Sequence, residues 1–319
     1  MPDHAELDCL LCIDAGQTGV RGEIIASPTT VEPGELIAEI DAPGIQSERP
    51  ALDQLVAFVG QAVDVLPAGA QLRQVAAGVS GLGADADAQR WLSALPGQVQ
   101  RVVVAHDSIT GYLAALGDQP GAVLACGTGV VTLAVGPAGT ARVDGWGHLI
   151  GDAGSGFWIG RAGLDLVMRA YDGRAEPTTL TGPVQADFPD LPQMYLTLQR
   201  DPARVSRIAS YAQTVSEHAQ AGDAGCVQIL QEAGRELAAS AVAGLRRVDL
   251  SGADRVPIGL VGMVFDSTLL RTAFETAISH SYPRAEFVRA AKRGLTGARA
   301  LANLPEHSEL YGAVLAARR

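Results

Sequence analysis

The sequence predicts an α/β protein with two similar domains, and three observations lead to this fold class. Short apolar runs typical of buried strands alternate with amphipathic segments typical of helices along most of the chain. The order strand, glycine-containing turn, strand, strand occurs twice, beginning near Cys9 and again near Ala122. The chain has 319 residues, of which 47% are hydrophobic, and this suffices for about two domains with separate cores.

The first half is expected to begin with a strand over Cys9–Ile13, a polar turn after it and a returning strand over Glu23–Ala26. A third strand is expected over Leu36–Ile40, and strand–helix units then follow. These remaining elements are a helix opened by Pro50, a strand over Val75–Val79, a helix over Ala86–Leu95, a strand over Val99–Ala105 and a helix ending near Leu116.

The second half is expected to restart after residues 117–121, whose glycines and proline mark a domain joint. Strands over Ala122–Cys126 and Val130–Val135 flank a glycine turn, as in the first half. The later elements are a strand over Ala141–Asp144, a mostly helical region over 178–250, a strand over Pro257–Val261, a helix to about Ser279, a strand over Glu286–Arg289, a helix over Gly294–Asn303 and a C-terminal tail. We therefore expect domains over residues 1–117 and 118–319, with a helical insertion at about 178–250 and ligands bound in an interdomain cleft.

The segment from Gly145 to Gly160 contains six glycines in sixteen residues, with two tryptophans and one carboxylate between them. Glycine is unfavourable inside helices and strands, so we expect a tight loop that a small polar ligand can approach closely. Trp146 would form an apolar wall, and Asp152, just before a helix start at Ser155, would anchor the ligand by hydrogen bonds. A structural turn into a core helix is the alternative interpretation.

Composition excludes several classes of function. The formal net charge of −11 makes nucleic acid and anionic membrane surfaces poor partners. No apolar run is long enough to span a membrane and the N-terminus is polar, so a cytoplasmic location is expected. Four cysteines are too few for a disulfide framework. Cys9 and Cys12 fall on one expected strand and would face opposite sides, so they should not share a metal.

Two turns at matching positions, residues 14–18 and Gly127-Thr128-Gly129, could hold phosphate oxygens through backbone N–H groups and a threonine hydroxyl. Asp14 could hold Mg²⁺ through water. Asp107 follows a strand and begins a helix, where a carboxylate could act as a general base or simply cap the helix. Ser80, in the spacing G-x-S-x-G, is a weaker alternative as a hydrolase nucleophile. The chain has no P-loop and no H-R-D or D-F-G motif, which excludes those two phosphotransferase classes.

These motifs together resemble the N-acetylglucosamine kinase group of the BadF/BadG/BcrA/BcrD-type ATPases, within the actin-like and hexokinase-like ATPase superfamily. The segment Gly145–Ile159 looks like the block G-W-G-H-x-x-G-D-x-G-S-x-x-W-I. Asp14–Thr18 and Cys126–Gly129 resemble the two phosphate motifs, and residues 106–108 resemble the strand-end aspartate segment. Residues 259–262 resemble the adenosine motif, and the resemblance spans roughly residues 9 to 303.

This resemblance implies two ribonuclease-H-like domains that bind ATP, Mg²⁺ and an amino sugar, in a protein that is often a homodimer. Asp107 would be the catalytic base that activates the sugar 6-hydroxyl, and Asp14 would hold the metal. The expected sugar contacts are Thr128, Trp146, Gly147 and Asp152. The expected nucleotide contacts are Gly16, Gln17, Thr18, Gly127 and Gly129 at the phosphates and Gly262 near adenine.

Several positions differ from the pattern of the resembled group. Ala153 stands where glutamate is common, and residues 44–47 lack an expected sugar-binding asparagine, which leaves N-acetylglucosamine and glucosamine both open. The first phosphate motif carries Ala15, Gln17 and Gly19 in place of its usual residues. A sugar-binding sensor without turnover, and a kinase of another small hydroxyl compound, are therefore alternative hypotheses.

Overall fold

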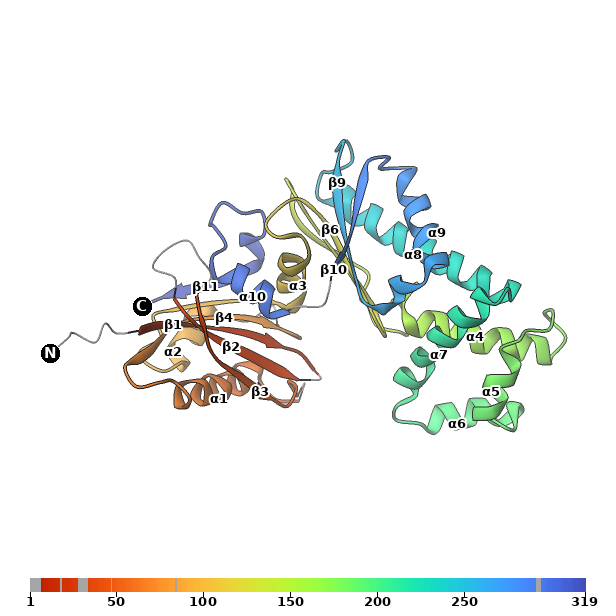
Figure 1. Cartoon of the computed structure of the whole chain (residues 1–319), viewed down its shortest axis with the longest axis horizontal. Coiled ribbons are helices and arrows are strands. Elements are labelled where there is room, and N and C mark those ends of the chain that lie inside the picture. The colour runs from red at the N-terminus through yellow and green to blue at the C-terminus, as the bar shows by residue number, and fades with distance from the viewer. Residues whose placement is uncertain (1–6, 18, 28–33, 47, 84, 291–293) are drawn as a thin grey trace. The chain divides into compact units, whose positions relative to one another are not determined.

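The computed structural model describes residues 7–17, 19–27, 34–46, 48–83, 85–290 and 294–319. The chain divides into two compact units (Figure 1). Unit 1 comprises Met1–Gln119 and Lys292–Arg319, and unit 2 comprises Pro120–Ala291. Within the described residues, no helix combines the length and the apolar character that a membrane span requires.

The sheet of unit 1 has the strand order β11-β5-β4-β1-β2-β3. β1, β2 and β3 are antiparallel neighbours, whereas β4 lies parallel to both β1 and β5. β11 pairs antiparallel with β5. The strands are β1 (Leu7–Ala15), β2 (Val20–Ala26), β3 (Leu36–Ala42), β4 (Ala70–Val79), β5 (Arg101–His106) and β11 (Val314–Arg318).

Helices cover both faces of this sheet (Figure 1). On one face, Cys9 belongs to the core formed with α1 (Ala51–Asp64) and α2 (Ala88–Ala94). On the other face, Cys12 packs against α10 (Gly294–Ala302), which lies beside α3 (Asp107–Leu116). The expected opposite orientation of the two cysteines is therefore confirmed, and it follows from the alternation of side chains along β1.

Unit 2 repeats the same arrangement, with the strand order β10-β9-β6-β7-β8. β6 pairs antiparallel with β7, and β7 pairs antiparallel with β8. β9 lies parallel to β6 and to β10. The strands are β6 (Gly121–Cys126), β7 (Val130–Gly136), β8 (Gly139–Val143), β9 (Val256–Val261) and β10 (Ala285–Ala290). When the strands of each unit are counted along the chain, both sheets have the spatial order third, second, first, fourth, fifth, and unit 1 adds β11 beside its fifth strand. This shared order confirms the predicted fold class of two ribonuclease-H-like domains.

The region between β8 and β9 is helical, as predicted for residues 178–250. α8 packs against β6, β7 and β8 and against α9, and α7 packs against α4 and α8. The helices are α4 (Gly156–Tyr171), α5 (Thr181–Asp187), η1 (Leu191–Gln193), α6 (Met194–Arg200), α7 (Arg204–Gln220) and α8 (Ala224–Arg247). After β9 come η2 (Met263–Asp266) and α9 (Thr268–Ser279), and η3 (Tyr311–Ala313) precedes β11.

The C-terminal part differs from the expected division of the chain at residues 117 and 118. The first segment of unit 1 ends close by, at Gln119, but Lys292–Arg319 also belongs to unit 1 rather than to a continuous second domain. The expected tail contains β11, whose Val314 lies opposite Ala105 of β5. The segment Val314–Arg318 lacks the polar–apolar alternation that identifies a strand from sequence.

Arg319 joins β11 to the end of α2. Its guanidinium donates hydrogen bonds to the carbonyl oxygens of Leu92 at 2.7 Å, Leu95 at 3.1 Å and Pro96 at 3.0 Å. It also donates to the carbonyl oxygen of Val99 at 2.8 Å. This side chain therefore links the C-terminal end of the chain to carbonyl groups at and just after the end of α2.

We predict that Arg319→Ala lowers the free energy of unfolding of unit 1 by about 1–3 kcal/mol, because buried carbonyls lose a charged donor. Urea denaturation followed by circular dichroism measures this change. The control is Arg318→Ala, which removes the neighbouring exposed guanidinium from the same strand. Equal urea midpoints for the two variants would show that the Arg319 hydrogen bonds do not stabilise the unit.

Candidate functional site

The turn Gly127-Thr128-Gly129 joins β6 to β7 and lies against the start of α4. The Gly127 N–H donates to the Gly129 carbonyl at 2.8 Å, which closes the turn. The N–H groups of Gly156 and Phe157 donate to the carbonyls of Gly127 at 2.8 Å and Thr128 at 2.9 Å. The turn and the helix start are therefore joined backbone to backbone.

Ser155 is the N-cap of α4, as predicted, and its hydroxyl accepts a hydrogen bond from the Trp158 N–H at 3.3 Å. Together with the two bonds to the turn, this bond uses the first three N–H groups of the helix. These three donors of the helix start are therefore used within the protein.

Asp144 organises the glycine-rich loop, and it was not among the residues selected from the sequence. Its Oδ1 atom accepts hydrogen bonds from the N–H groups of Gly145 and Asp152, both at 2.8 Å. Its Oδ2 atom accepts from the Ala153 N–H at 3.0 Å. Asp144 itself has φ of 57°, in the left-handed region. An aspartate followed by glycine at the end of a strand is a turn signal that could have identified it.

Asp152 lies under this loop with φ of 59° and only 8% of its surface exposed. Burial raises the pKa of its carboxyl group, and the N–H groups of Val130 and Gly147 oppose this rise. A Cβ on Gly129 would come within 2.7 Å of Asp152 Oδ2, so the carboxylate rests directly on the turn. Unit 2 thus brings Asp152 together with the Thr128–Gly129 turn and Gly147.

Trp146 is 64% exposed, and the Arg142 guanidinium lies 5.6 Å from its ring centroid. The ring is therefore available as an apolar surface at the rim of the loop. A cavity of about 400 Å³ lies between residues 148–151 of the loop and the first turns of α4, and His148 and Arg161 are among the residues that line it. The His148 ring packs against Phe157 at 4.9 Å between ring centroids.

A second cavity of about 580 Å³ begins at Gly127 and Thr128 and continues between α7 and η2. The described residues that line it include no lysine or arginine. They provide two carboxylates, two amides and several hydroxyls beside apolar side chains, among them Glu217, Asp266, Gln213, Gln220, Ser210, Met263 and Val264. Carboxylates without cations are unsuited to phosphate and suited to the hydroxyl and amino donors of a nucleoside.

Gly262 sets the position of η2 at the edge of this cavity. Its φ is 108°, and a Cβ there would come within 1.8 Å of the carbonyl oxygen of Cys126. Because Cys126 immediately precedes the Gly127 turn, the backbone after β9 lies directly against the backbone that enters the turn. The predicted phosphate and adenosine motifs of unit 2 are therefore neighbours.

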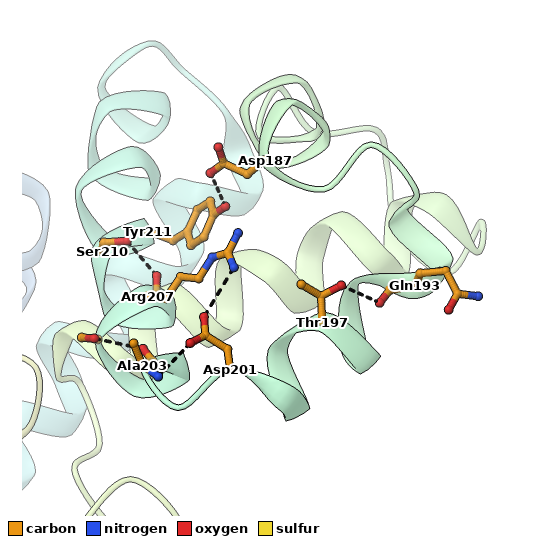
Figure 2. Close-up of polar contacts among 9 residues, drawn as sticks. Asp187, Gln193, Thr197, Asp201, Ala203, Arg207, Ser210 and Tyr211 are labelled. Carbon is orange, nitrogen blue, oxygen red and sulfur yellow. Dashed lines mark hydrogen bonds and ion pairs between the residues drawn. The ribbon is translucent and has the colours of Figure 1, made fainter.

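The other wall of the cavity, α7, is held in place by polar contacts on its far side (Figure 2). The Tyr211 hydroxyl donates to Asp187 at 2.5 Å, and Arg207 donates to Asp201 at 3.4 Å. The Arg207 guanidinium also lies 4.5 Å from the centroid of the Phe188 ring. The helices α5 and α6 therefore brace the helix that carries Ser210 into the cavity wall.

In unit 1, Asp14 and Asp107 lie at the same edge of the sheet. Asp14 lies opposite Gly78 near the end of β4, and Val79 of β4 lies opposite His106. Since neighbouring strands lie 4.7–4.9 Å apart, the backbones of β1 and β5 are roughly 10 Å apart. Parallel strands thus bring two carboxylates to the edge where ligands of open α/β sheets bind.

Asp107 is the first residue of α3, and its Oδ1 atom lies 2.8 Å from Nδ1 of His106. The same ring nitrogen lies 3.2 Å from the Ser108 N–H, so His106 caps the helix and contacts the candidate base. Ser80 is different, because α2 begins only at Ala88 and no strand–turn–helix elbow forms around it. The alternative of a Ser80 nucleophile is therefore wrong.

The first turn has the hairpin form expected of it. The Gly16 N–H donates to the Gly19 carbonyl at 3.0 Å, and the Gly16 carbonyl accepts from the Ile45 N–H at 2.9 Å. Gln17 is exposed, and a Cβ on Gly44 would come within 2.0 Å of its carbonyl oxygen. Thr18, the remaining expected phosphate contact, lies outside the described residues.

Asp14 is the candidate metal ligand, and the start of α10 lies against it, since a Cβ on Gly294 would come within 2.1 Å of Asp14 Cγ. The described residues contain no group of three or more histidine, cysteine, aspartate or glutamate side chains that could hold a metal. One carboxylate fits Mg²⁺, which is commonly held by one or two carboxylates, by substrate phosphates and by water.

Residues 13–302 match the BadF/BadG/BcrA/BcrD ATPase family. The chain belongs to this family. It is 27% identical over 196 residues to an N-acetylmuramic acid/N-acetylglucosamine kinase of Clostridium acetobutylicum, covering 60% of this chain and 64% of that protein. It is also 27% identical over 226 residues to an N-acetyl-D-glucosamine kinase of Dictyostelium discoideum, covering 66% of this chain and 69% of that protein.

Among solved structures, the fold is similar to a Chromobacterium violaceum protein provisionally assigned as an N-acetylglucosamine kinase. The TM-score is 0.64 at 27% identity, and the match covers 93% of this chain and 99% of the other. The match to the Clostridium relative spans slightly less than two thirds of that protein's length. The family and the two-domain fold inferred from the motifs are thus confirmed.

In this family member, we predict that Gly262→Ala lowers the free energy of unfolding of unit 2 by about 2–4 kcal/mol. The new Cβ would overlap the Cys126 carbonyl, and alanine disfavours positive φ. Gly127→Ala is the matched control, because a Cβ there meets no atom within 4 Å. The control should change the free energy of unfolding by less than about 1 kcal/mol in urea titrations. Equal losses would contradict the packing described at Gly262.

The raised pKa of Asp152 predicts a pH-dependent stability difference. A carboxyl group whose pKa is higher in the folded state stabilises the fold below its ordinary pKa of 3.8, and this contribution is lost as pH rises through the folded-state pKa. The free energy of unfolding of Asp152→Asn minus that of the wild type should therefore increase between pH 3.5 and 7. Urea unfolding at several pH values measures it.

Asp152→Ala provides the control for this experiment, because it also removes the titrating group but loses the hydrogen-bond acceptors. It should show the same trend with pH at lower absolute stability. A difference that stays constant or decreases with rising pH would contradict the assignment of a raised pKa to Asp152.

Proposed function

We propose that this protein is an ATP-dependent amino-sugar kinase that phosphorylates the 6-hydroxyl of N-acetylglucosamine or glucosamine. The observation that carries the proposal is the contact between the Gly127–Gly129 turn and the Asp152 carboxylate, beside a cavity of nucleoside size. A phosphate-binding turn therefore has a hydrogen-bonding anchor for a hydroxyl-rich ligand on one side and space for a nucleoside on the other. The names of the two relatives agree with this substrate class.

In this proposal the nucleoside occupies the cavity between α7 and η2, with Gly262 at its edge. The triphosphate extends over Gly127 and Gly129 in unit 2. The phosphate contacts proposed for unit 1 are Gly16, Gln17 and Thr18. Thr128, Trp146, Gly147 and Asp152 contact the sugar. The Trp146 ring covers an apolar face of the sugar, and Asp152 accepts hydrogen bonds from its hydroxyls.

Asp107 acts as the general base. Its carboxylate takes the proton of the sugar 6-hydroxyl while that oxygen bonds to the γ-phosphorus, and the bond from the γ-phosphorus to the bridging oxygen breaks to release ADP. His106 Nδ1 lies 2.8 Å from Asp107 Oδ1, beside the carboxylate. Asp14 would hold Mg²⁺, which neutralises charge on the phosphate oxygens when bound.

We further propose that the protein is a cytoplasmic homodimer.

N-acetylmuramic acid is a second candidate substrate, and one observation favours it. This sugar is N-acetylglucosamine with a carboxylate-bearing ether, and the cavity beside the loop is lined by His148 and Arg161. The Arg161 guanidinium next to the proposed sugar anchor could pair with such a carboxylate. The name of the Clostridium relative includes this sugar.

We predict that Asp107→Asn lowers kcat by about 10²–10⁴-fold, because the amide cannot accept the hydroxyl proton. The dissociation constant for ATP should change by less than about twofold. A coupled ADP-release assay and calorimetric ATP titration measure the two quantities. The matched control is Asp53→Asn, at an exposed position of α1, which should retain wild-type turnover.

The substrate is tested with the same ADP-release assay across N-acetylglucosamine, glucosamine, N-acetylmuramic acid, glucose and small alcohols. Turnover confined to amino sugars supports the proposal. Thermal stabilisation by one sugar without any ADP release would identify a sensor instead. Turnover with a non-sugar alcohol alone would identify a kinase of another class. In the separate test of the general base, unchanged turnover in Asp107→Asn would remove Asp107 from the mechanism.

A further inference from the structure

We infer that Arg289 is a positioning residue for the nucleotide: it fixes the shape of the η2 wall of the cavity between α7 and η2. This inference rests on the proposed placement of the nucleoside in that cavity. Arg289 lies on β10 opposite Leu260 of β9, outside every motif that the sequence singled out. Its side chain extends from there to the segment that forms the cavity edge.

The guanidinium contacts both ends of η2. Its Nη1 atom donates to the carbonyl oxygen of Gly262 at 3.0 Å and to that of Leu260 at 3.3 Å. Its Nη2 atom donates to Asp266 Oδ1 at 2.5 Å. One planar group thus joins the residue before the turn to the last residue of the turn, a spacing that the fork of an arginine can span and a single ammonium cannot.

Two backbone hydrogen bonds that connect η2 to its flanking residues are long. The Phe265 N–H donates to the Gly262 carbonyl, and the Ser267 N–H donates to the Val264 carbonyl, both at 3.4 Å. Distances of this size are beyond the usual range for N–H···O bonds. The 3.0 Å bond from Arg289 is therefore the shorter of the two that the Gly262 carbonyl accepts.

Packing beneath the guanidinium favours the same orientation of η2. The Arg289 guanidinium lies 6.0 Å from the centroid of the Phe265 ring, which is fully buried and packs edge-on to Phe274 at 5.7 Å. Phe265 thus anchors the inner side of η2 while Met263, Val264 and Asp266 face the cavity. Without the guanidinium, η2 would keep the buried ring and the Gly262 backbone contact but would lose the charged link between its two ends.

Charge provides a second reason for an arginine here. Asp266 lines the cavity, so its carboxylate would repel a nucleotide triphosphate if it were not neutralised. The Arg289 and Asp266 side chains are 39% and 65% exposed, so the ion pair contributes little to overall stability. Loss of Arg289 should therefore change nucleotide binding more than it changes folding.

The experiment compares Arg289→Met with the wild type in steady-state kinetics that vary ATP and the sugar separately. We expect the KM for ATP to rise by about tenfold, since the variant loses charged hydrogen bonds that shape one wall of the cavity. The kcat and the sugar KM should change by less than about twofold. Arg289→Lys, which can reach only part of the acceptor set, should give an intermediate KM for ATP.

Arg284→Met is the matched control. Arg284 precedes β10 and makes an exposed ion pair with Asp254 at 2.5 Å, but neither residue lines the cavity. This variant should keep the wild-type KM for ATP. The melting temperatures of both methionine variants should lie within about 3 °C of the wild type.

The double variant Arg289→Met, Asp266→Asn separates shape from charge. Removal of the unpaired carboxylate should recover only part of the lost ATP affinity. Full recovery would overturn the positioning role and leave charge neutralisation alone. A KM for ATP within twofold of the wild type in Arg289→Met, or equal rises in the KM values for ATP and sugar, would overturn the inference altogether.

A cavity-filling variant, Ser210→Phe on α7, distinguishes failure of this inference from failure of the nucleotide placement. If the phenylalanine raises the KM for ATP and Arg289→Met does not, the nucleotide occupies the cavity and Arg289 has no positioning role. If neither variant changes the KM for ATP, the placement of the nucleotide is wrong, and the inference is overturned with it. Should Arg289→Met fail to fold, Arg289→Lys decides by the same criteria.

Discussion

The candidate site of unit 2 depends on backbone segments that pack against one another without intervening side chains. The turn after β6 is held by the start of α4 on one side and by the strand end at Gly262 on the other, where a single Cβ would overlap the Cys126 carbonyl. Such packing places peptide groups more exactly than side-chain contacts do, because it has no rotamers to select. The Asp152 carboxylate, which rests on Gly129, derives its position from the same contacts.

The two units share a strand order, but they supply different chemistry at the corresponding edge. In unit 1 the ends of β1 and β5 carry carboxylates, Asp14 and Asp107, and the region between β3 and β4 contains one helix. In unit 2 the equivalent edge carries a turn of backbone donors, and five α-helices and a 3₁₀ turn occupy the equivalent connection. The duplicated scaffold thus carries carboxylates at this edge in one unit and a glycine turn in the other.

Much of the fold could be predicted from the sequence, because strand periodicity and glycine-containing turns are local signals. The duplicated order, the hairpin turns and the Ser155 cap were identified in this way. β11 was missed because its pairing with β5 is a long-range contact made by a weakly patterned segment. The assignment of residues 292–319 to the second domain failed for the same reason.

The candidate site was less accessible to sequence reasoning. Motif residues such as Gly127 and Asp152 could be selected by composition and spacing, but their contact through Gly129 could not. Asp144 and Arg289 bind backbone groups of residues distant in sequence, and spacing does not predict such partners, although the Asp144-Gly145 pair does signal a turn. The Ser155 cap could be predicted, but the hydrogen bonds from the start of α4 to the turn after β6 could not.

The unequal construction of the two cavity walls has a consequence for divergence within the family. The backbone at Gly262 leaves no room for any side chain, so substitution of this residue alone would disrupt the packing. The wall at α7 is lined by small residues such as Ser206, Ala209 and Ser210 and is braced from behind by Tyr211 and Arg207. New ligand preferences can therefore arise by enlarging or reshaping side chains along one helix, and protein engineers seeking enzymes for altered cofactors would begin there.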